Sequence, residues 1–178
     1  MDEACEKGAK VVVFPELCIT GYTCQDLFLQ DTLIDKAKEE LVRIAEHSKK
    51  LDGIFFVGLP LDINGNLYNV AAAVAGGDIL GIVPKTYLPN YNEFYEARHF
   101  RSGADMDTSY ELETAYETIF IPMGTDILFT CANMPQLKIG VEICEDLWTP
   151  QPPSIRHAMA GATLIVNLSA QVNTFCLM

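Results

Sequence analysis

The sequence predicts a layered α/β (α+β) protein in which sheets with antiparallel neighbours pack against a few helices. Three observations indicate this fold class. Short apolar runs typical of buried strands recur along the chain, glycine-containing turns join several of them into hairpins, and one clear amphipathic helix precedes the hairpins. Consecutive hairpins exclude a purely parallel sheet, and several strands with few helices favour sheets layered against helices.

The first elements predicted are the last turns of a helix over residues 2–10, which Gly8 ends, and a strand at 10–14. The clearest helix covers residues 31–51, with Thr32 as its cap and Asp35 three residues on. Its apolar stripe consists of Ile34, Ala37, Leu41, Ile44 and Ala45.

Hairpin signals follow this helix. A strand is predicted at 54–58, and Asn64-Gly65 is a strong turn signal that joins residues 61–63 to 67–75. Gly76-Gly77-Asp78 predicts a second turn before a strand at 79–83. Further strands are expected at 118–121, 127–130, 137–143 and 163–168, with a helix at 154–161. Residues 86–117 lack a periodic pattern, which is typical of a lid or pocket wall; for 102–117 an acidic surface loop is the alternative.

Composition narrows the classes of function. A chain of 178 residues that is 49% hydrophobic and 20% charged has room for one domain with a large core. Its net charge of -12 argues against a nucleic-acid surface, and no apolar stretch has the roughly 20 residues that span a bilayer. The acidic amino terminus is unlike a secretory signal, and the six cysteines show no close pairing, so we expect reduced thiols and a cytoplasmic location. No Cys-x-x-Cys motif occurs and the three histidines are far apart, so no metal site is expected.

Three chemical groups follow predicted strands. Glu16 comes after the strand at 10–14, Lys85 after the strand at 79–83, and Cys144 after the strand at 137–143. Groups just past the carboxyl ends of strands converge on a shared crevice in layered sheets. A base, a cation and a nucleophile of these kinds predict hydrolysis of an amide or nitrile through an acyl thioester, without metal or cofactor. Taken singly, each residue has a structural alternative: a buried thiol, a solvated lysine and a glutamate that caps a turn.

The residues around these three groups resemble the carbon-nitrogen hydrolase (nitrilase) superfamily. Phe14-Pro15-Glu16-Leu17, Pro84-Lys85 and Ile143-Cys144-Glu145-Asp146 match its pattern in order and setting. Longer segments at 14–28, 85–98 and 141–148 are most similar to the glutaminase domains of glutamine-dependent NAD+ synthetases. The resemblance implies a four-layer α-β-β-α sandwich over residues 1–178, as a partial glutaminase domain.

The resemblance also implies roles for individual residues. Glu16 matches the general base, Lys85 the cation that stabilises the intermediate, and Cys144 the nucleophile. Tyr91 and Ser169 match residues of the glutamine pocket, while aromatic packing is an equally open interpretation of Tyr91 and Phe94. Either Glu93 or Glu96 is the acid that supports the lysine. Glu145 binds the ammonium group of the substrate or orients the turn, and Lys85 is expected to outweigh its effect on the thiol.

Departures from the family pattern set further expectations. The family's first strand, most of its first helix, its last strands and its synthetase domain are expected to be missing, so the sandwich is incomplete at both ends. Residues 171–178 do not follow the family pattern, and an arginine that holds glutamine is absent there. ATP and deamido-NAD are used only by the synthetase domain, and no glycine-rich phosphate loop occurs here.

The expected partners are therefore glutamine as substrate, a synthetase domain that receives ammonia in the parent enzyme, and further copies of the chain. Two alternatives remain open. One is a free-standing amidase of the same superfamily, and the other is an inactive fragment or binding module.

Overall fold

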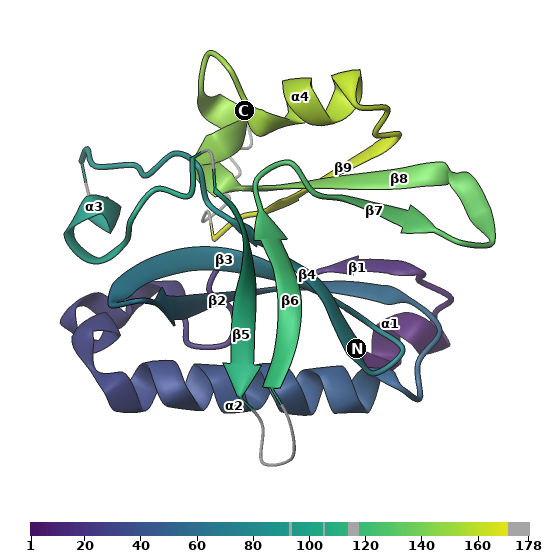
Figure 1. Cartoon of the computed structure of the whole chain (residues 1–178), viewed down its shortest axis with the longest axis horizontal. Coiled ribbons are helices and arrows are strands. Elements are labelled where there is room, and N and C mark those ends of the chain that lie inside the picture. Colours follow the sequence, from purple (N-terminus) through teal and green to yellow (C-terminus); the bar gives the residue numbers. More distant parts are fainter. Residues whose placement is uncertain (93, 105, 114–117, 171–178) are drawn as a thin grey trace, which may run out of the picture.

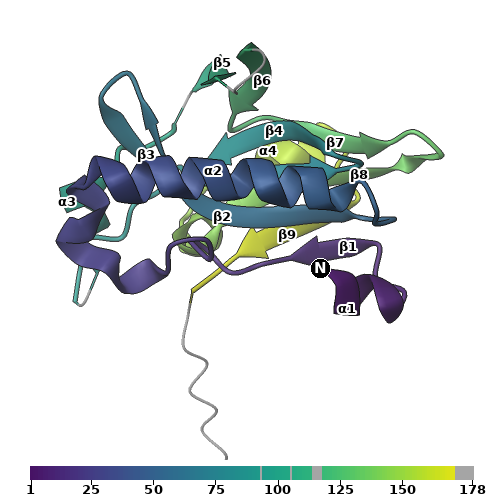
Figure 2. The same ribbon diagram turned by 90° about the horizontal axis from the view of Figure 1, so that it is seen from below.

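The computed structural model describes residues 1–92, 94–104, 106–113 and 118–170. They form four layers in the order helix, sheet, sheet, helix (Figure 1). The outer layers are α2 (Asp31–Ser48) and α4 (Pro153–Met159). Figure 2 shows α2 running along the outer face of the larger sheet. The predicted mixed α/β architecture is confirmed, with the α-β-β-α order that the resemblance implied.

The larger sheet has six strands in the order β1-β2-β3-β4-β6-β5. Its strands are β1 (Val11–Val13), β2 (Ile54–Ile63), β3 (Asn66–Ala75), β4 (Asp78–Pro84), β5 (Asp107–Glu113) and β6 (Thr118–Gly124). β2, β3 and β4 form the two predicted hairpins, whereas β1 pairs with β2 and β4 with β6 in parallel. Asn64 and Gly65 have φ angles of 53° and 77°, as the tight turn between β2 and β3 requires.

The smaller sheet consists of β7 (Leu128–Cys131), β8 (Met134–Ile143) and β9 (Leu164–Leu168). β8 and β9 are parallel and are joined through α4, which packs on β8. Short helical segments complete the described chain: α1 (Asp2–Glu6), α3 (Glu96–His99), and the 3-10 segments η1 (Tyr22–Leu29) and η2 (Cys144–Trp148). In the described ranges, no helix is both long and apolar enough to cross a membrane.

Two apolar cores hold the layers together. Between α2 and the larger sheet, Leu41 and Ala45 pack with Phe55 and Val57 of β2. On the other face of β2, Phe56 packs between the two sheets against Phe129 of β7, with ring centroids 5.6 Å apart. Alternate residues of β2 therefore serve different cores, which explains why this strand is a nearly continuous apolar run.

Three expectations about local structure are corrected. The N-cap of α2 is Gln30, which makes no side-chain capping bond, so Thr32 lies inside the helix. β2 continues through Pro60 without a break, because β1 pairs only with residues 54–56 and no β1 partner lies opposite the proline. The region 102–117 is not simply a surface loop, since β5 pairs along its length with β6. Tyr110 and Leu112 of β5 are buried, and the exposed acids Asp107, Glu111 and Glu113 of the same strand had obscured this alternation.

Candidate active site

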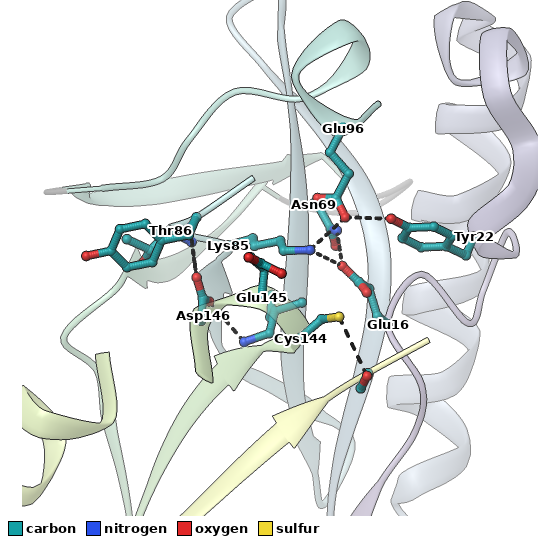
Figure 3. Close-up of polar contacts among 12 residues, drawn as sticks. Glu16, Tyr22, Asn69, Lys85, Thr86, Glu96, Cys144, Glu145 and Asp146 are labelled. Atoms are coloured by element: carbon teal, nitrogen blue, oxygen red, sulfur yellow. Dashed lines mark hydrogen bonds and ion pairs between the residues drawn. The ribbon is translucent and has the colours of Figure 1, made fainter. Parts of the chain in front are cut away.

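A buried ion cluster forms where β1 and β4 end. The Nζ atom of Lys85 donates hydrogen bonds to Oε1 of Glu16 at 2.6 Å and to Oε1 of Glu96 at 2.7 Å (Figure 3). Glu16 lies in the turn after β1, Lys85 follows β4, and Glu96 opens α3. The side chains of Lys85 and Glu16 have no exposed surface. The acid bonded to Lys85 is thus Glu96, whereas Glu93 lies outside the described residues.

The charged groups in this cluster shift one another's pKa values. Burial alone would lower the pKa of Lys85, but the carboxylates of Glu16 and Glu96 outweigh burial and raise it. Burial also raises the pKa of Glu96, an effect that Lys85 opposes and the negative charge of Glu16 reinforces. The side chain of Lys85 is therefore a charged ammonium group at neutral pH.

Asn69 and Tyr22 complete the cluster, although neither was predicted as a site residue. Asn69 on β3 donates from Nδ2 to Oε1 of Glu16 at 2.7 Å, and the hydroxyl of Tyr22 donates to Oε1 of Glu96 at 2.8 Å. Oε1 of Glu16 thus receives two donors, while its Oε2 is buried and has no hydrogen-bond partner in the described part of the chain. Tyr22 lies in a segment that carries the family resemblance, but nothing in the sequence singles out Asn69 within its strand.

Cys144 approaches this cluster from the smaller sheet. It opens η2 directly after β8, with a left-handed backbone φ of 46°. Its N–H donates to Oδ1 of Asn167 at 3.2 Å, and the hydroxyl of Ser169 donates to its Sγ at 3.6 Å. Figure 3 shows the side chains of Cys144, Glu16 and Lys85 directed into one space. The structure therefore brings together the three groups whose convergence the sequence analysis assumed.

The pKa of the Cys144 thiol is raised. Burial is the main cause and the charge of Glu16 adds to it, while Lys85 and the Ser169 hydrogen bond act in the opposite direction. Lys85 lowers the pKa of the thiol, as expected, but burial and Glu16 together outweigh it. The expectation compared Lys85 with Glu145 alone, and that comparison stays a prediction. A thiol with a raised pKa is protonated at neutral pH and needs a base to react.

Glu145 faces a tyrosine across the site. The hydroxyl of Tyr91 lies 2.8 Å and 3.0 Å from the two carboxylate oxygens of Glu145. The ring of Tyr91 also packs edge-to-face against Phe94, with centroids 5.7 Å apart, and Phe94 packs in the same way against Tyr22. Aromatic packing of Tyr91 and Phe94 is thus present, and it places the Tyr91 hydroxyl at Glu145. Among the described residues, no group of three or more His, Cys, Asp or Glu side chains is suited to hold a metal ion.

A four-layer α-β-β-α sandwich with a thiol, a lysine and a glutamate between its two sheets is typical of enzymes that hydrolyse carbon-nitrogen bonds. Residues 1–175 match the family described as Carbon-nitrogen hydrolase, and the chain belongs to this family. The glutamine-dependent NAD(+) synthetase of Mycobacterium tuberculosis is 41% identical over 170 residues, which are 95% of this chain and 24% of that protein. The protein of the same name from Thermotoga maritima is 33% identical over 166 residues, covering 93% of this chain and 25% of its own length.

Solved structures agree with this assignment. A glutamine-dependent NAD(+) synthetase from Cytophaga hutchinsonii superposes with a TM-score of 0.80 at 34% identity, covering 96% of this chain and 26% of that one. An amidase of the nitrilase superfamily from Nesterenkonia shares the fold, with a TM-score of 0.66 at 20% identity, covering 97% and 56% of the two chains. The chain spans about a quarter of the length of the curated relatives it matches.

Proposed function

We propose that this chain is the glutamine amidohydrolase unit of a glutamine-dependent NAD+ synthetase, in which it releases ammonia for a synthetase domain. The names of its relatives support glutamine as the substrate. The observation that carries the proposal is the buried pair of Glu16 and Lys85 facing the Cys144 thiol. In this proposal the chain needs no cofactor of its own, and ATP and deamido-NAD belong to the synthetase part.

The first half of the proposed reaction forms a thioester. Glu16 accepts the thiol proton at Oε2, which accepts no hydrogen bond from the described residues, as Sγ of Cys144 bonds to the amide carbon of glutamine. Lys85 and a backbone N–H beyond the cysteine stabilise the negative charge that develops on the amide oxygen. The C–N bond then breaks, and Glu16 returns the proton to the nitrogen, so that ammonia leaves.

The second half hydrolyses the thioester. Glu16 takes a proton from water as the water oxygen bonds to the acyl carbon, and the C–S bond then breaks. The proton returns to sulfur, which restores the thiol and releases glutamate. Glu96 keeps its position beside Lys85 throughout and holds the ammonium group in place.

Three residues are proposed to recognise the substrate. Glu145 carries a carboxylate at the edge of the site, suited to the ammonium group of glutamine, and Tyr91 orients that carboxylate through its hydroxyl. The hydroxyl of Ser169 donates to the sulfur, and in this proposal it also contacts the substrate next to the bond that breaks.

The proposal is tested by incubating the purified chain with L-glutamine and measuring glutamate and ammonia. A panel of other amides and of nitriles is assayed in parallel, and a glutamine-like electrophile is used to label the protein for peptide mass spectrometry. We expect hydrolysis of glutamine and a label on Cys144. The Cys144→Ala variant should remain folded by circular dichroism, because it removes little volume. It should neither hydrolyse glutamine nor take up the label, because it lacks the thiol.

Other outcomes distinguish the alternatives. Hydrolysis confined to a nitrile or another amide would assign a different substrate within the same superfamily. Folded protein that neither hydrolyses glutamine nor takes the label at Cys144 would favour a binding module, and near wild-type turnover by Cys144→Ala would refute the nucleophile.

A further inference from the structure

Asp146 connects the two turns that carry Lys85 and Cys144. Its Oδ1 accepts hydrogen bonds from the backbone N–H groups of Thr86 at 3.1 Å and Tyr87 at 2.8 Å. Its Oδ2 accepts from the N–H of Ile143 at 3.0 Å. Thr86 and Tyr87 directly follow Lys85, and Ile143 directly precedes Cys144. One carboxylate therefore ties the end of β4 in the larger sheet to the end of β8 in the smaller sheet (Figure 3).

This link uses both oxygens of a buried charge. Asp146 is 1% exposed, and burial raises its pKa to about 6. The three N–H donors and Lys85 lower this pKa but do not offset the effect of burial. A neutral side chain of the same shape would avoid the cost of burying the charge. An asparagine, however, has only one acceptor atom, so it can serve one of the two turns and must present an N–H group to the other. Only the carboxylate satisfies both turns.

Three other titratable groups on or next to η2 have partners of their own. Glu142 of β8 accepts from the N–H of Ser154, His157 of α4 lies 2.8 Å from the carbonyl of Thr125, and Glu145 bonds to Tyr91. The remaining groups near Asp146 are Cys144, whose thiol is neutral at pH 7, and the ammonium of Lys85, which favours the charged form of Asp146. Asp146 is thus the titratable group that joins the two turns.

We infer that Asp146 is a positioning residue that holds the Cys144 thiol against Glu16 and Lys85. The inference rests on the proposed function, because it assigns the residue to the same reaction. Protonation of Asp146 converts one acceptor oxygen into a hydroxyl, so the link weakens as the pH falls through about 6. Protonation of Asp146 weakens the link between the turns but favours the folded state. An acid with a raised folded-state pKa contributes stability below its ordinary value of 3.8, and this contribution is lost as the pH rises through about 6.

The test measures alkylation of Cys144 by iodoacetamide between pH 5 and 8, by peptide mass spectrometry. The probe forms a C–S bond and releases iodide, and Glu16 takes the thiol proton. In Asp146→Asn we expect alkylation of Cys144 at pH 7.5 to fall roughly 10-fold or more, because a positioned general base contributes about 10²–10⁴-fold. The exposed Cys131 should react at an unchanged rate in the same samples.

The pH profile separates positioning from a general structural role. The wild type should lose additional reactivity below about pH 6, and Asp146→Asn should lack this inflection. Asp126→Asn is the matched control, because Asp126 is an exposed acid that pairs with Arg156. A Cys144 rate in folded Asp146→Asn that is unchanged or higher, or a retained inflection, would overturn the inference. Absence of glutamine hydrolysis by a wild type with the expected profile would instead refute the glutaminase proposal alone.

Discussion

At the scale of single residues, the two oxygens of Glu16 have different surroundings. Oε1 is held by Lys85 and Asn69, whereas Oε2 has no hydrogen-bond partner within the described chain. A carboxylate held at one oxygen cannot turn freely, so its other oxygen keeps a fixed direction. This fixed direction is what a base needs if it is to meet a thiol that is protonated at neutral pH.

Replacing Asn69 tests how much the fixed direction contributes. Asn69→Ala removes one donor to a buried carboxylate, and such bonds are worth about 1.5–3 kcal/mol. We expect a loss of stability in this range and about a 10-fold slower alkylation of Cys144. Urea denaturation and peptide mapping measure the two effects. Asn66→Ala, at an exposed position of the same strand, is the control and should change neither. Unchanged reactivity of Cys144 in folded Asn69→Ala would show that Asn69 does not contribute to the reactivity of the thiol.

Replacing Lys85 tests the ion cluster. Lys85→Met leaves the buried carboxylates of Glu16 and Glu96 without their cation, which should cost about 3–5 kcal/mol. Lys85 lowers the pKa of Glu96, so its loss raises that already elevated pKa further. Such an acid contributes stability below its ordinary value of 4.5 that is lost as the pH rises through the folded-state value. The variant should therefore be less stable at pH 8 than at pH 5.

Urea denaturation at the two pH values measures this difference. Adding Glu96→Gln to Lys85→Met should recover part of the stability at pH 8, because it removes one of the unpaired charges. If the variant is equally stable at both pH values, other groups must neutralise the charges of Glu16 and Glu96 in the absence of Lys85.

At the scale of elements, the turn that carries Glu16 depends on a glycine in the neighbouring strand. A Cβ atom on Gly58 of β2 would lie 2.4 Å from the backbone N of Leu17 and 2.8 Å from the carbonyl oxygen of Pro15. The turn is also held by a hydrogen bond from the N–H of Ile19 to the carbonyl of Gly58 at 3.1 Å. The backbone of β2 thus sets how deeply Glu16 reaches into the site.

The Gly58→Ala variant should displace this turn. We expect reduced stability together with at least 10-fold slower alkylation of Cys144 in the folded protein, since Glu16 would move away from the thiol. Gly140→Ala is the matched control, because its Cβ would lie 2.6 Å from Nδ1 of His157, on the far side of the smaller sheet. It should destabilise the protein and leave the reactivity of the folded fraction nearly unchanged. Equal effects of the two changes on reactivity would contradict this account.

The elements also show what could be predicted from sequence. Asn64-Gly65 predicted its hairpin correctly, because the turn conformation is a local property of these two residues. β5 was missed, because acidic side chains on its exposed face hide the alternation of Tyr110 and Leu112. The approach of Cys144 to Glu16 was suggested by their places after strands, but Asn69 and Asp146 were not recognised. Their roles arise from contacts with residues 53 and 60 or so positions away, which no local pattern records.

At the scale of the whole molecule, the site is divided between the two sheets. Glu16, Asn69 and Lys85 belong to the larger sheet or to turns at its edge, and Cys144 and Ser169 follow strands of the smaller sheet. The sheets are held together by an apolar core that includes Phe56 and Phe129. This core therefore sets the distance between Glu16 and Cys144.

The Phe56→Ala variant tests this division. Truncating a buried phenylalanine should cost about 3–5 kcal/mol, and here the cavity opens between the sheets. We expect slower alkylation of Cys144 in the folded fraction as the sheets adjust. Leu41→Ala is the control, because it removes a buried side chain of similar cost from the core between α2 and the larger sheet. Thermal denaturation and peptide mapping compare the two, and unchanged Cys144 reactivity in folded Phe56→Ala would contradict the idea.

The backbone conformation of Cys144 limits which residues can replace it. Its φ of 46° is a conformation that side chains branched at Cβ adopt with difficulty. Serine has the same shape as cysteine there and would keep the turn, whereas threonine would strain the backbone before any chemistry began. Only unbranched side chains can therefore be exchanged at this position with the turn preserved.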